Sequence, residues 1–301
     1  MPAEKFHFSA GVNLGTGRGE ALSEKHLTGV FDNLKMAEPI KVVVHGALGR
    51  MGREVLSALC HDPSVEPVGA VEKEVSQQYL PLPDGSRLIP FSPNLESVLT
   101  RCHPRVLVDF TTAEAAMSAA RTAARNGVSI VIGTTGLSAN DLTQIDEVSR
   151  ANGVGAVVAP NFALGAALMI HSAKVAARFF DHADIIEMHH EQKADAPSGT
   201  ALSTARAMVD SRGKPFISTP TQKENLAGTR GGQFEGIDLH SIRLPGFLAH
   251  QEVILGGPGQ TLTIRHDTTG RDCYIPGVLL AIKEVVKLKG LVYGLGALLG
   301  L

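Results

Sequence analysis

The sequence predicts an α/β protein in which a doubly wound parallel sheet precedes a smaller α+β part with an open mixed or antiparallel sheet. Between residues 40 and 160, short runs rich in β-branched residues alternate regularly with longer runs of helical pattern. Such alternation produces right-handed crossovers and a parallel sheet covered by helices on both faces. After Pro160 the rhythm changes, and three strand patterns follow one another with short connections, as in antiparallel sheets.

The first part contains five strand patterns separated by helical patterns. The strands cover residues 40–46, 65–72, 105–110, 129–136 and 154–160, and the helices cover residues 50–61, 111–126 and 138–150. Thr111 with Glu114, and Ser138 with Asp141, have the spacing of capping boxes, which predicts where two helices begin. The proline-rich stretch 81–93 is predicted to be irregular.

The second part begins with two helices and one strand, followed by a predicted antiparallel meander. The helices cover residues 164–180 and 199–209, the strand between them covers 183–190, and the meander covers 239–244, 249–257 and 260–267. In the last strand, Leu262, Ile264 and His266 share one face, which we expect to be buried against helices or a second subunit. A helix over 278–288 is expected to pack back on the first part.

These patterns divide the chain into three parts. We expect a flexible extension over residues 1–38, a first domain over 39–160 that is completed by 270–301, and a second domain over 161–269. Residues 1–35 are polar and rich in glycine, and a clean strand pattern starts only at Ile40. An upstream start codon would explain this extension equally well, and a chain that begins at Met36 is expected to keep its stability and activity.

The composition indicates a well-packed protein and argues against nucleic acid as a partner. Of 301 residues, 44% are hydrophobic and 19% are charged. The formal net charge of −2 and the lack of tryptophan provide neither a basic surface nor stacking platforms for nucleic acid.

Neither a membrane span nor a metal site is predicted. No apolar run reaches the ~18–20 residues that a span needs, and the N-terminal segment lacks the apolar core of a signal peptide. Cys60, Cys102 and Cys273 are far apart, and the twelve histidines form no HExxH motif. We therefore expect reduced thiols, no bound metal and a cytoplasmic location.

Three glycines, Gly46, Gly49 and Gly52, follow the first strand and open the first helix. Glycine in this position permits a tight turn and a close approach of the backbone to a pyrophosphate, which the free N–H groups of the helix N-terminus attract. Arg50 adds a mobile cation. The spacing GxxGxxG differs from the common GxGxxG, and a glycine-rich turn without a ligand remains an alternative. The turn nevertheless favours a Rossmann-type domain that binds a nicotinamide dinucleotide.

Several strand ends at the same sheet edge support this interpretation. Glu72 ends the second strand about 20 residues after Gly52, where an acid accepts from the ribose 2′-OH, and Lys73 beside it is suited to a 2′-phosphate. We therefore predict that both NADH and NADPH are used. Thr134 and Thr135 end the fourth strand and are suited to a nicotinamide ribose, and Asn161 ends the fifth and is suited to the carboxamide.

The segment from residue 187 to residue 200, EMHHEQKADAPSGT, carries the clearest catalytic signal. A histidine donates protons readily near neutral pH, and His189 and His190 point to opposite faces if the strand continues. Ser198 is predicted to cap a helix whose N–H groups, at Gly199 and Thr200, together with Lys193 would bind a carboxylate. A polar loop with surface histidines is the alternative.

Residues 40–301 resemble the 4-hydroxy-tetrahydrodipicolinate reductase (dihydrodipicolinate reductase) family. The motifs that carry the resemblance are GALGRMG from Gly46, VDFT around Asp109, IGTTG from Ile132, PNFALG from Pro160 and, above all, HHxxKxDAPSGTA from His189. The resemblance implies a Rossmann domain, a substrate domain with an open sheet, and a homotetramer built through that sheet. It also implies reduction of a cyclic imine dicarboxylate in diaminopimelate and lysine biosynthesis.

The resemblance further implies a role for each matching residue. His189 and Lys193 would be catalytic, with His189 as the proton donor, whereas His190, Ser198, Gly199 and Thr200 would bind substrate. The residues implied to contact NADPH or NADH are Gly46, Ala47, Leu48, Gly49, Arg50, Met51, Glu72, Lys73, Gly133, Thr134, Thr135, Ala159, Pro160, Asn161 and Phe162.

One stretch departs from the common bacterial pattern. Residues 243–250, RLPGFLAH, differ from the Arg-x-Gly…Gly-Glu-His pattern and resemble a cyanobacterial-type variant. Two other functions remain to be weighed: another two-domain NAD(P)-dependent dehydrogenase, similar to aspartate or homoserine dehydrogenases, and a nucleotide-binding protein without catalysis.

Overall fold

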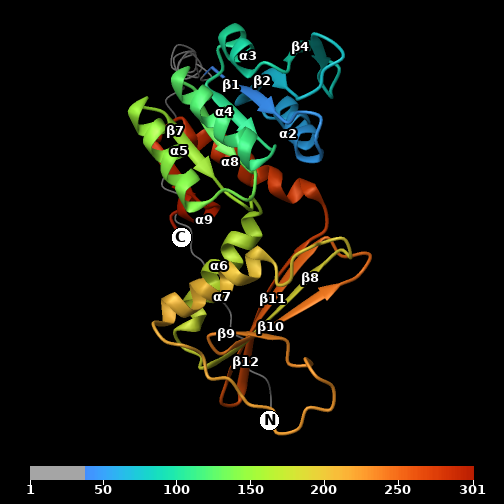
Figure 1. Ribbon diagram of the computed structural model, residues 1–301, viewed down its shortest axis with the longest axis vertical. Coiled ribbons are helices and arrows are strands. Elements are labelled where there is room, and N and C mark those ends of the chain that lie inside the picture. The colour runs from blue at the N-terminus through green and yellow to red at the C-terminus, as the bar shows by residue number, and fades with distance from the viewer. Residues whose placement is uncertain (1–37) are drawn as a thin grey trace, which may run out of the picture. The chain divides into compact units, whose positions relative to one another are not determined.

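An eight-stranded sheet forms the first part of the fold in the computed structural model, which describes residues 38–301 (Figure 1). The extension predicted over residues 1–38 therefore lies almost entirely outside the described residues. The strand order is β13-β7-β6-β5-β1-β2-β4-β3, and every pair is parallel except β3 with β4. The strands are β1 (Ile40–His45), β2 (Val65–Val71), β3 (Tyr79–Pro81), β4 (Leu88–Ser92), β5 (Val106–Asp109), β6 (Ser129–Ile132), β7 (Gly155–Val158) and β13 (Gly290–Tyr293).

This sheet has the predicted doubly wound topology. From β1 the chain proceeds outward through β2 and β4, returns to β5 on the other side of β1, and continues through β6 and β7. The order reverses between β1 and β5, and ligands of such sheets bind in the crevice outside the carboxyl ends of the strands at this point. His45 and Asp109, the last residues of β1 and β5, are partners in the register.

Helices cover both faces of the sheet because its central strands are apolar on both sides. Val42 and Val44 of β1 belong to one core with α2 (Arg50–His61) and α8 (Ile275–Val285), whereas Val43 belongs to the other core. That other core contains side chains of α3 (Leu95–Cys102), α4 (Ala113–Arg125) and α5 (Ala139–Ala151). The C-terminal segment therefore packs on this sheet through α8, and it ends with β13 and α9 (Leu295–Leu298).

One of the two predicted capping boxes is present. Ser138 caps α5, and its exchange of hydrogen bonds with Asp141 is complete. The prediction for Thr111 is wrong, because the cap of α4 is Thr112, whose side chain accepts from the Ala115 N–H. The Thr111 hydroxyl donates to the buried Asp109 carboxylate instead, at 2.9 Å.

The stretch 81–93, predicted to be irregular, contains the short strand β4 and the last residue of β3, and the short helix α3 that follows it was not predicted. Tyr79 to Pro81 of β3 pair with Leu88 to Pro90 of β4, and β4 extends the parallel sheet beside β2. Pro81 is tolerated there because β3 is the edge of the sheet and needs few ladder hydrogen bonds. Asn94 caps α3 by accepting from the Ser97 N–H.

A five-stranded mixed sheet forms the second part, in the order β12-β11-β8-β10-β9. Its strands are β8 (His182–His189), β9 (Gly232–Phe234), β10 (Ile237–Arg243), β11 (Ala249–Gly257) and β12 (Gln260–Thr268). The meander prediction is wrong at one place: β8 lies between β10 and β11 and runs parallel to β10. The chain between β8 and β10 includes a whole helix, so it is long enough for the crossover that parallel pairing requires.

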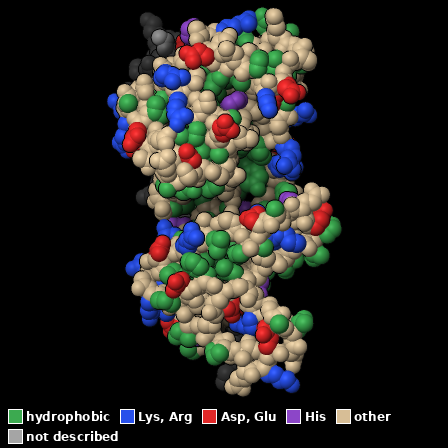
Figure 2. Space-filling model, in the orientation of Figure 1, with side chains coloured by type: hydrophobic (Ala, Val, Ile, Leu, Met, Phe, Trp, Pro, Cys, Tyr) green, Lys and Arg blue, Asp and Glu red, His purple; other side chains and the backbone are tan. Residues whose placement is uncertain are grey.

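Helices α6 (Leu164–Ala177) and α7 (Gly199–Arg212) lie side by side against one face of this sheet. Their alanines and Met208 pack on Ile185, Val253 and other strand residues in one core. The outer face of α6 is also apolar, with Leu168 and Val175 exposed and Phe179 exposed just after the helix, and Figure 2 shows hydrophobic side chains gathered over α6 and α7. Periodicity alone therefore does not reveal which face of α6 is buried.

Residues 39–301, with both sheets, form one compact unit. Within residues 38–301, no helix combines the length and the hydropathy that crossing a membrane requires.

Candidate active site

The glycine turn between β1 and α2 has a backbone shape that admits a phosphate. Gly46 has φ +78°, and a Cβ there would lie 2.7 Å from the Phe110 carbonyl oxygen. A Cβ on Gly52 would lie 2.1 Å from the Gly46 oxygen, so glycine is required where the helix packs on the turn. Within residues 38–301, the N–H groups of Arg50 and Met51 have no hydrogen-bond acceptor. These free donors at the start of α2 fit a dinucleotide pyrophosphate.

A cavity of about 670 Å³ lies on one side of this turn. Gly46, Gly49, Glu72 and Lys73 line it, together with residues at the start of α3 and along α4. Glu72 is held in place, because its carboxylate accepts from the N–H groups of Leu48 and Lys73, each at 3.0 Å. The cavity fits the adenosine half of a dinucleotide, with Glu72 in its wall as a fixed acceptor for the ribose.

Where the strand order reverses, between β1 and β5, lies a buried cluster whose members the sequence did not indicate as a group. Asp109 is fully buried and accepts from His45 Nδ1 at 2.7 Å. The hydroxyls of Thr111 and Thr134 also donate to it, at 2.9 Å and 2.7 Å. Thr134, expected at a ribose, thus lies beneath the site and supports the strand ends, whereas His45 and Thr111 line the cavity.

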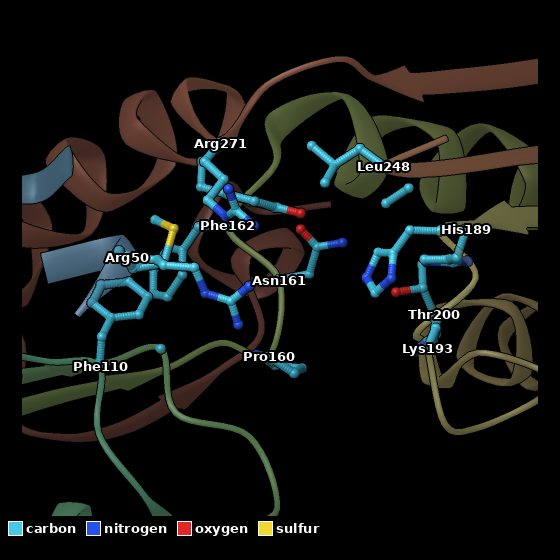
Figure 3. Close-up of a pocket in the computed structure, with 15 residues that line it drawn as sticks. Arg50, Phe110, Pro160, Asn161, Phe162, His189, Lys193, Thr200, Leu248 and Arg271 are labelled. Carbon is cyan, nitrogen blue, oxygen red and sulfur yellow. The ribbon is translucent and has the colours of Figure 1, made fainter. Parts of the chain in front are cut away.

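A second cavity, of about 420 Å³, is lined by residues of both parts of the fold (Figure 3). From the first part come Arg50, Met51, Phe110, Gly133, Pro160, Asn161 and Phe162, and from the second come His189, His190, Lys193, Thr200, Leu248 and Ala249, with Arg271 and Tyr274 from the segment after β12. Figure 3 shows Arg50 and Arg271 on one side, His189 on the other, and Asn161 between them. Among the described residues that line this cavity there is no carboxylate, which suits an anionic ligand.

Asn161 points into this cavity with one end of its amide already fixed. Its Oδ1 accepts from the Ala163 N–H at 2.9 Å, at the start of α6. The amide NH₂ is therefore the group that remains to donate to a ligand, such as a carboxamide oxygen.

His189 is the last residue of β8, and a buried carboxylate holds its ring in place. Its Nδ1 lies 2.6 Å from Oε2 of Glu187, whose side chain is 1% exposed. Arg243 binds both oxygens of the same carboxylate, at 2.9 Å and 2.7 Å. Burial alone would raise the pKa of the Glu187 carboxyl, but hydrogen bonds from His189 and Arg243 outweigh burial and hold that pKa at about 2. Glu187 is thus a charged group inside the second part, and neither it nor Arg243 was among the predicted site residues.

The loop after β8 and the start of α7 complete the second half of the cavity. Lys193 pairs with Asp195 at 2.6 Å and keeps its side chain 21% exposed. Ser198 caps α7, as predicted, and its own N–H donates to Glu187 at 3.1 Å. In the part of the chain that the structure describes, the N–H groups of Gly199 and Thr200 have no acceptor, which fits a ligand carboxylate there.

The structure does not bring every predicted residue to a cavity wall. Ala47 and Ala159 are fully buried, and Leu48 and Thr135 are exposed beside the site. Conversely, the sequence did not indicate Phe110, Arg271, Tyr274 or Leu248 as lining residues. Leu248 belongs to the variant stretch 243–250, which therefore contributes to the site, and Arg271 offered no signal because it lies far from every motif.

The fold and this pair of cavities define an oxidoreductase that binds a nicotinamide dinucleotide at the carboxyl edge of its first sheet. Family models described as the N-terminus and the C-terminus of dihydrodipicolinate reductase match residues 40–162 and 165–299. The chain belongs to the dihydrodipicolinate reductase family, which confirms the resemblance seen in the sequence.

Individual relatives match this chain over nearly their whole length. The 4-hydroxy-tetrahydrodipicolinate reductase of Dehalococcoides mccartyi is 54% identical over 263 residues, which cover 87% of this chain and 99% of the relative. That of Synechocystis is 47% identical over 270 residues, covering 86% and 98%. A dipicolinate-bound dihydrodipicolinate reductase from Paenisporosarcina sp. TG-14 superimposes with a TM-score of 0.78 at 39% identity, covering 86% and 99%. An amine dehydrogenase from Mycobacterium smegmatis shares only the fold, with a TM-score of 0.58 at 17% identity over 84% of this chain and 94% of its own.

Proposed function

We propose that this protein reduces 4-hydroxy-tetrahydrodipicolinate to tetrahydrodipicolinate with NADPH or NADH, in diaminopimelate and lysine biosynthesis. The observation that carries the proposal is the cavity of about 420 Å³, which unites Arg50, Met51 and Asn161 with His189, Lys193 and Thr200. It supports a cofactor on one wall and a small cyclic dicarboxylate on the other. The family membership and the dipicolinate-bound relative point to the same ligand class.

The residues at the glycine turn would hold the cofactor. The free N–H groups of Arg50 and Met51 would bind its pyrophosphate, and the fixed carboxylate of Glu72 would accept from its adenosine ribose. A bound reduced nicotinamide supplies a hydride. Asn161 would orient the nicotinamide through its free amide NH₂.

The residues of the second part would bind substrate and supply the proton. One substrate carboxylate would accept from the N–H groups of Gly199 and Thr200, and Lys193 and His190 would face the dianion. His189 would donate a proton as the hydride is added. The net reaction takes up one hydride and one proton and releases the 4-hydroxyl group as water, so a proton donor beside the substrate is required.

A coupled assay tests this function. The unstable substrate is generated in place by its upstream synthase, and oxidation of NADPH or NADH is followed by absorbance. We expect turnover that depends on the synthase. Turnover of another amino or oxo acid from a substrate panel, with none here, would instead support an aspartate- or homoserine-dehydrogenase-like enzyme. Binding of NAD(P)H without any turnover would support a non-catalytic protein.

The domain boundaries at residues 39, 160 and 270, the homotetramer and the cytoplasmic location also remain predictions. Sedimentation at several protein concentrations tests the tetramer, and a dimer or monomer throughout would contradict it.

A further inference from the structure

We propose that Glu187, clamped by Arg243, is a positioning residue that keeps a hydrogen on Nδ1 of His189 and so reserves Nε2 for the proton given to substrate. This inference rests on the proposed function for its meaning in catalysis. Its structural core, the state of one histidine ring, can be measured without any substrate.

The first step is the contact between two residues on one strand. Glu187 and His189 are two positions apart in β8, so their side chains lie on the same face of the sheet. The Glu187 side chain is 1% exposed and its Oε2 lies 2.6 Å from His189 Nδ1, whereas the histidine side chain is 15% exposed. His189 also lines the cavity where Lys193 and Thr200 lie. The ring thus has one nitrogen anchored inside, which leaves the other for the ligand side.

The second step is the charge of the anchor. The pKa of about 2 leaves Glu187 ionised at neutral pH. An ionised carboxylate only accepts hydrogen bonds, so the nitrogen that faces it must donate. Nδ1 therefore carries a hydrogen whether the ring is neutral or charged. The proton that the ring gains and loses is the one on Nε2.

The third step is the clamp on the carboxylate. Arg243, at the end of β10, binds both Glu187 oxygens, and its Nη2 also donates to the Asp195 carbonyl at 2.7 Å. A bidentate arginine fixes the plane of a carboxylate and favours its ionised form. Arg243 therefore keeps Glu187 from taking the Nδ1 hydrogen for itself, and it ties the loop after β8 to the same anchor.

The fourth step links the proton donor to the substrate cradle. Oε1 of Glu187 accepts from the Ser198 N–H at 3.1 Å, and Ser198 caps α7, whose next two N–H groups face the site. One buried carboxylate therefore sets the position of the His189 ring and of the helix start that would hold a substrate carboxylate. A displacement of either relative to the other would cost rate, because reacting groups must be aligned closely.

The substitution Glu187→Gln separates these roles, because it keeps the shape and removes the charge. The glutamine oxygen is expected in the place of Oε1, where it accepts from the Ser198 N–H and from Arg243 Nη2. Its NH₂ then takes the place of Oε2, where it loses the hydrogen bond from Arg243 Nη1 and forces His189 Nδ1 to accept. We expect the neutral ring to change from the Nδ1–H to the Nε2–H tautomer and kcat to fall at least about 10²-fold, with little change in KM for the cofactor.

The tautomer is read by ¹⁵N NMR of protein with labelled histidines, at a pH where the rings are neutral. The His189 signals are assigned as those missing from His189→Gln. Other charged or titratable groups are close, namely Lys193, His190, His250 and His266, so the spectrum is more decisive than a pH profile of the rate. The matched control is Glu191→Gln, an exposed residue two positions after the histidine, which should change neither the tautomer nor kcat.

A second variant keeps the test decisive. Glu187→Asp, which retains a carboxylate, should keep the Nδ1–H tautomer and recover part of kcat, and this variant serves if the glutamine variant does not fold. An unchanged tautomer or an unchanged kcat in folded Glu187→Gln would overturn the proposal, as would an Nε2–H tautomer in Glu187→Asp. If the wild type shows no turnover in the coupled assay, the proposed function fails while the tautomer result still stands.

Discussion

The residues of this site fall into two groups: residues that line the cavity, and residues outside the cavity wall that hold the lining residues in place. His189, Lys193 and Asn161 line the cavity, whereas Glu187, Arg243 and Asp109 lie outside its wall. The motifs indicated residues of the first kind, because their chemistry is familiar at those spacings. Residues of the second kind cannot be told from other acids and bases in the sequence, because their role depends on the partner beside which folding buries them.

Replacing His189 by Gln removes the proposed proton donor and leaves the cofactor cavity intact. We expect kcat to fall by about 10²–10⁴-fold, the usual contribution of a general acid. Steady-state kinetics together with fluorescence titration of NADPH binding measure both quantities. An unchanged kcat would exclude His189 from the mechanism, and a matching loss of cofactor binding would indicate a general structural effect.

Lys73 carries the prediction about cofactor choice. Its ammonium has no carboxylate partner within residues 38–301, and it lines the cavity next to the fixed Glu72. Lys73→Ala should raise KM for NADPH several-fold and leave KM for NADH nearly unchanged, because only NADPH carries a 2′-phosphate. A wild-type preference of more than a thousandfold for either cofactor would contradict dual use.

Among the elements, those with local signals were predicted well and those that depend on partners were not. Helix α2 and strand β11 have the expected ends, and the Ser138 capping box is present, because hydrophobic period and caps are read within a few residues. The position of β8 between β10 and β11 was missed. Which strand pairs with which depends on the path of α7 across the sheet, and no local pattern encodes that path.

The close packing of α2 on the glycine turn leads to a prediction about these two elements. A Cβ on Gly52 would lie 2.1 Å from the Gly46 oxygen, so Gly52→Ala should push α2 away from the turn. We expect a loss of stability on the order of 1–3 kcal/mol, as for other overpacked sites, and weaker dinucleotide binding. Urea unfolding and binding titrations measure these effects. The matched control is Gly296→Ala in α9, where a Cβ meets nothing within 4 Å, so equal losses in both variants would contradict the explanation.

For the molecule as a whole, two ion-paired carboxylates with lowered pKa values contribute to the response to acid. Hydrogen bonds from Lys283 and Ser64 lower the pKa of Asp62 to about 2, and this ion pair joins the end of α2 to α8. In the second sheet, the ion pair of Glu187 with Arg243 joins β8 to β10, and the pKa of Glu187 is also about 2. The two groups lie in different parts of the fold, and protonation of each carboxylate weakens the part that contains it.

The unfolding free energy should therefore fall as pH drops from about 4.5 toward 2. In that range the unfolded chain binds a proton at residue 187 and the folded chain does not, so the folded state loses its advantage. We expect the ionised Glu187 to contribute on the order of 3 kcal/mol at neutral pH, because its pKa is lowered from 4.5 to about 2. Urea unfolding at several pH values tests this, and Glu187→Gln should show a shallower dependence. Equal slopes in the two proteins would contradict the prediction.

The sequence alone determined the class of fold, the glycine turn and the His189–Thr200 segment, because these depend on residue order over short distances. The family motifs also predicted the cofactor and the substrate class. Only the tertiary structure decided which charges are buried together and which segments share a cavity wall. Glu187 and Arg243 are 56 positions apart, and Arg271 is farther still from the glycine turn. Their roles arise because sheet pairing and core packing bring distant strand ends together, and that proximity is a property of the folded chain.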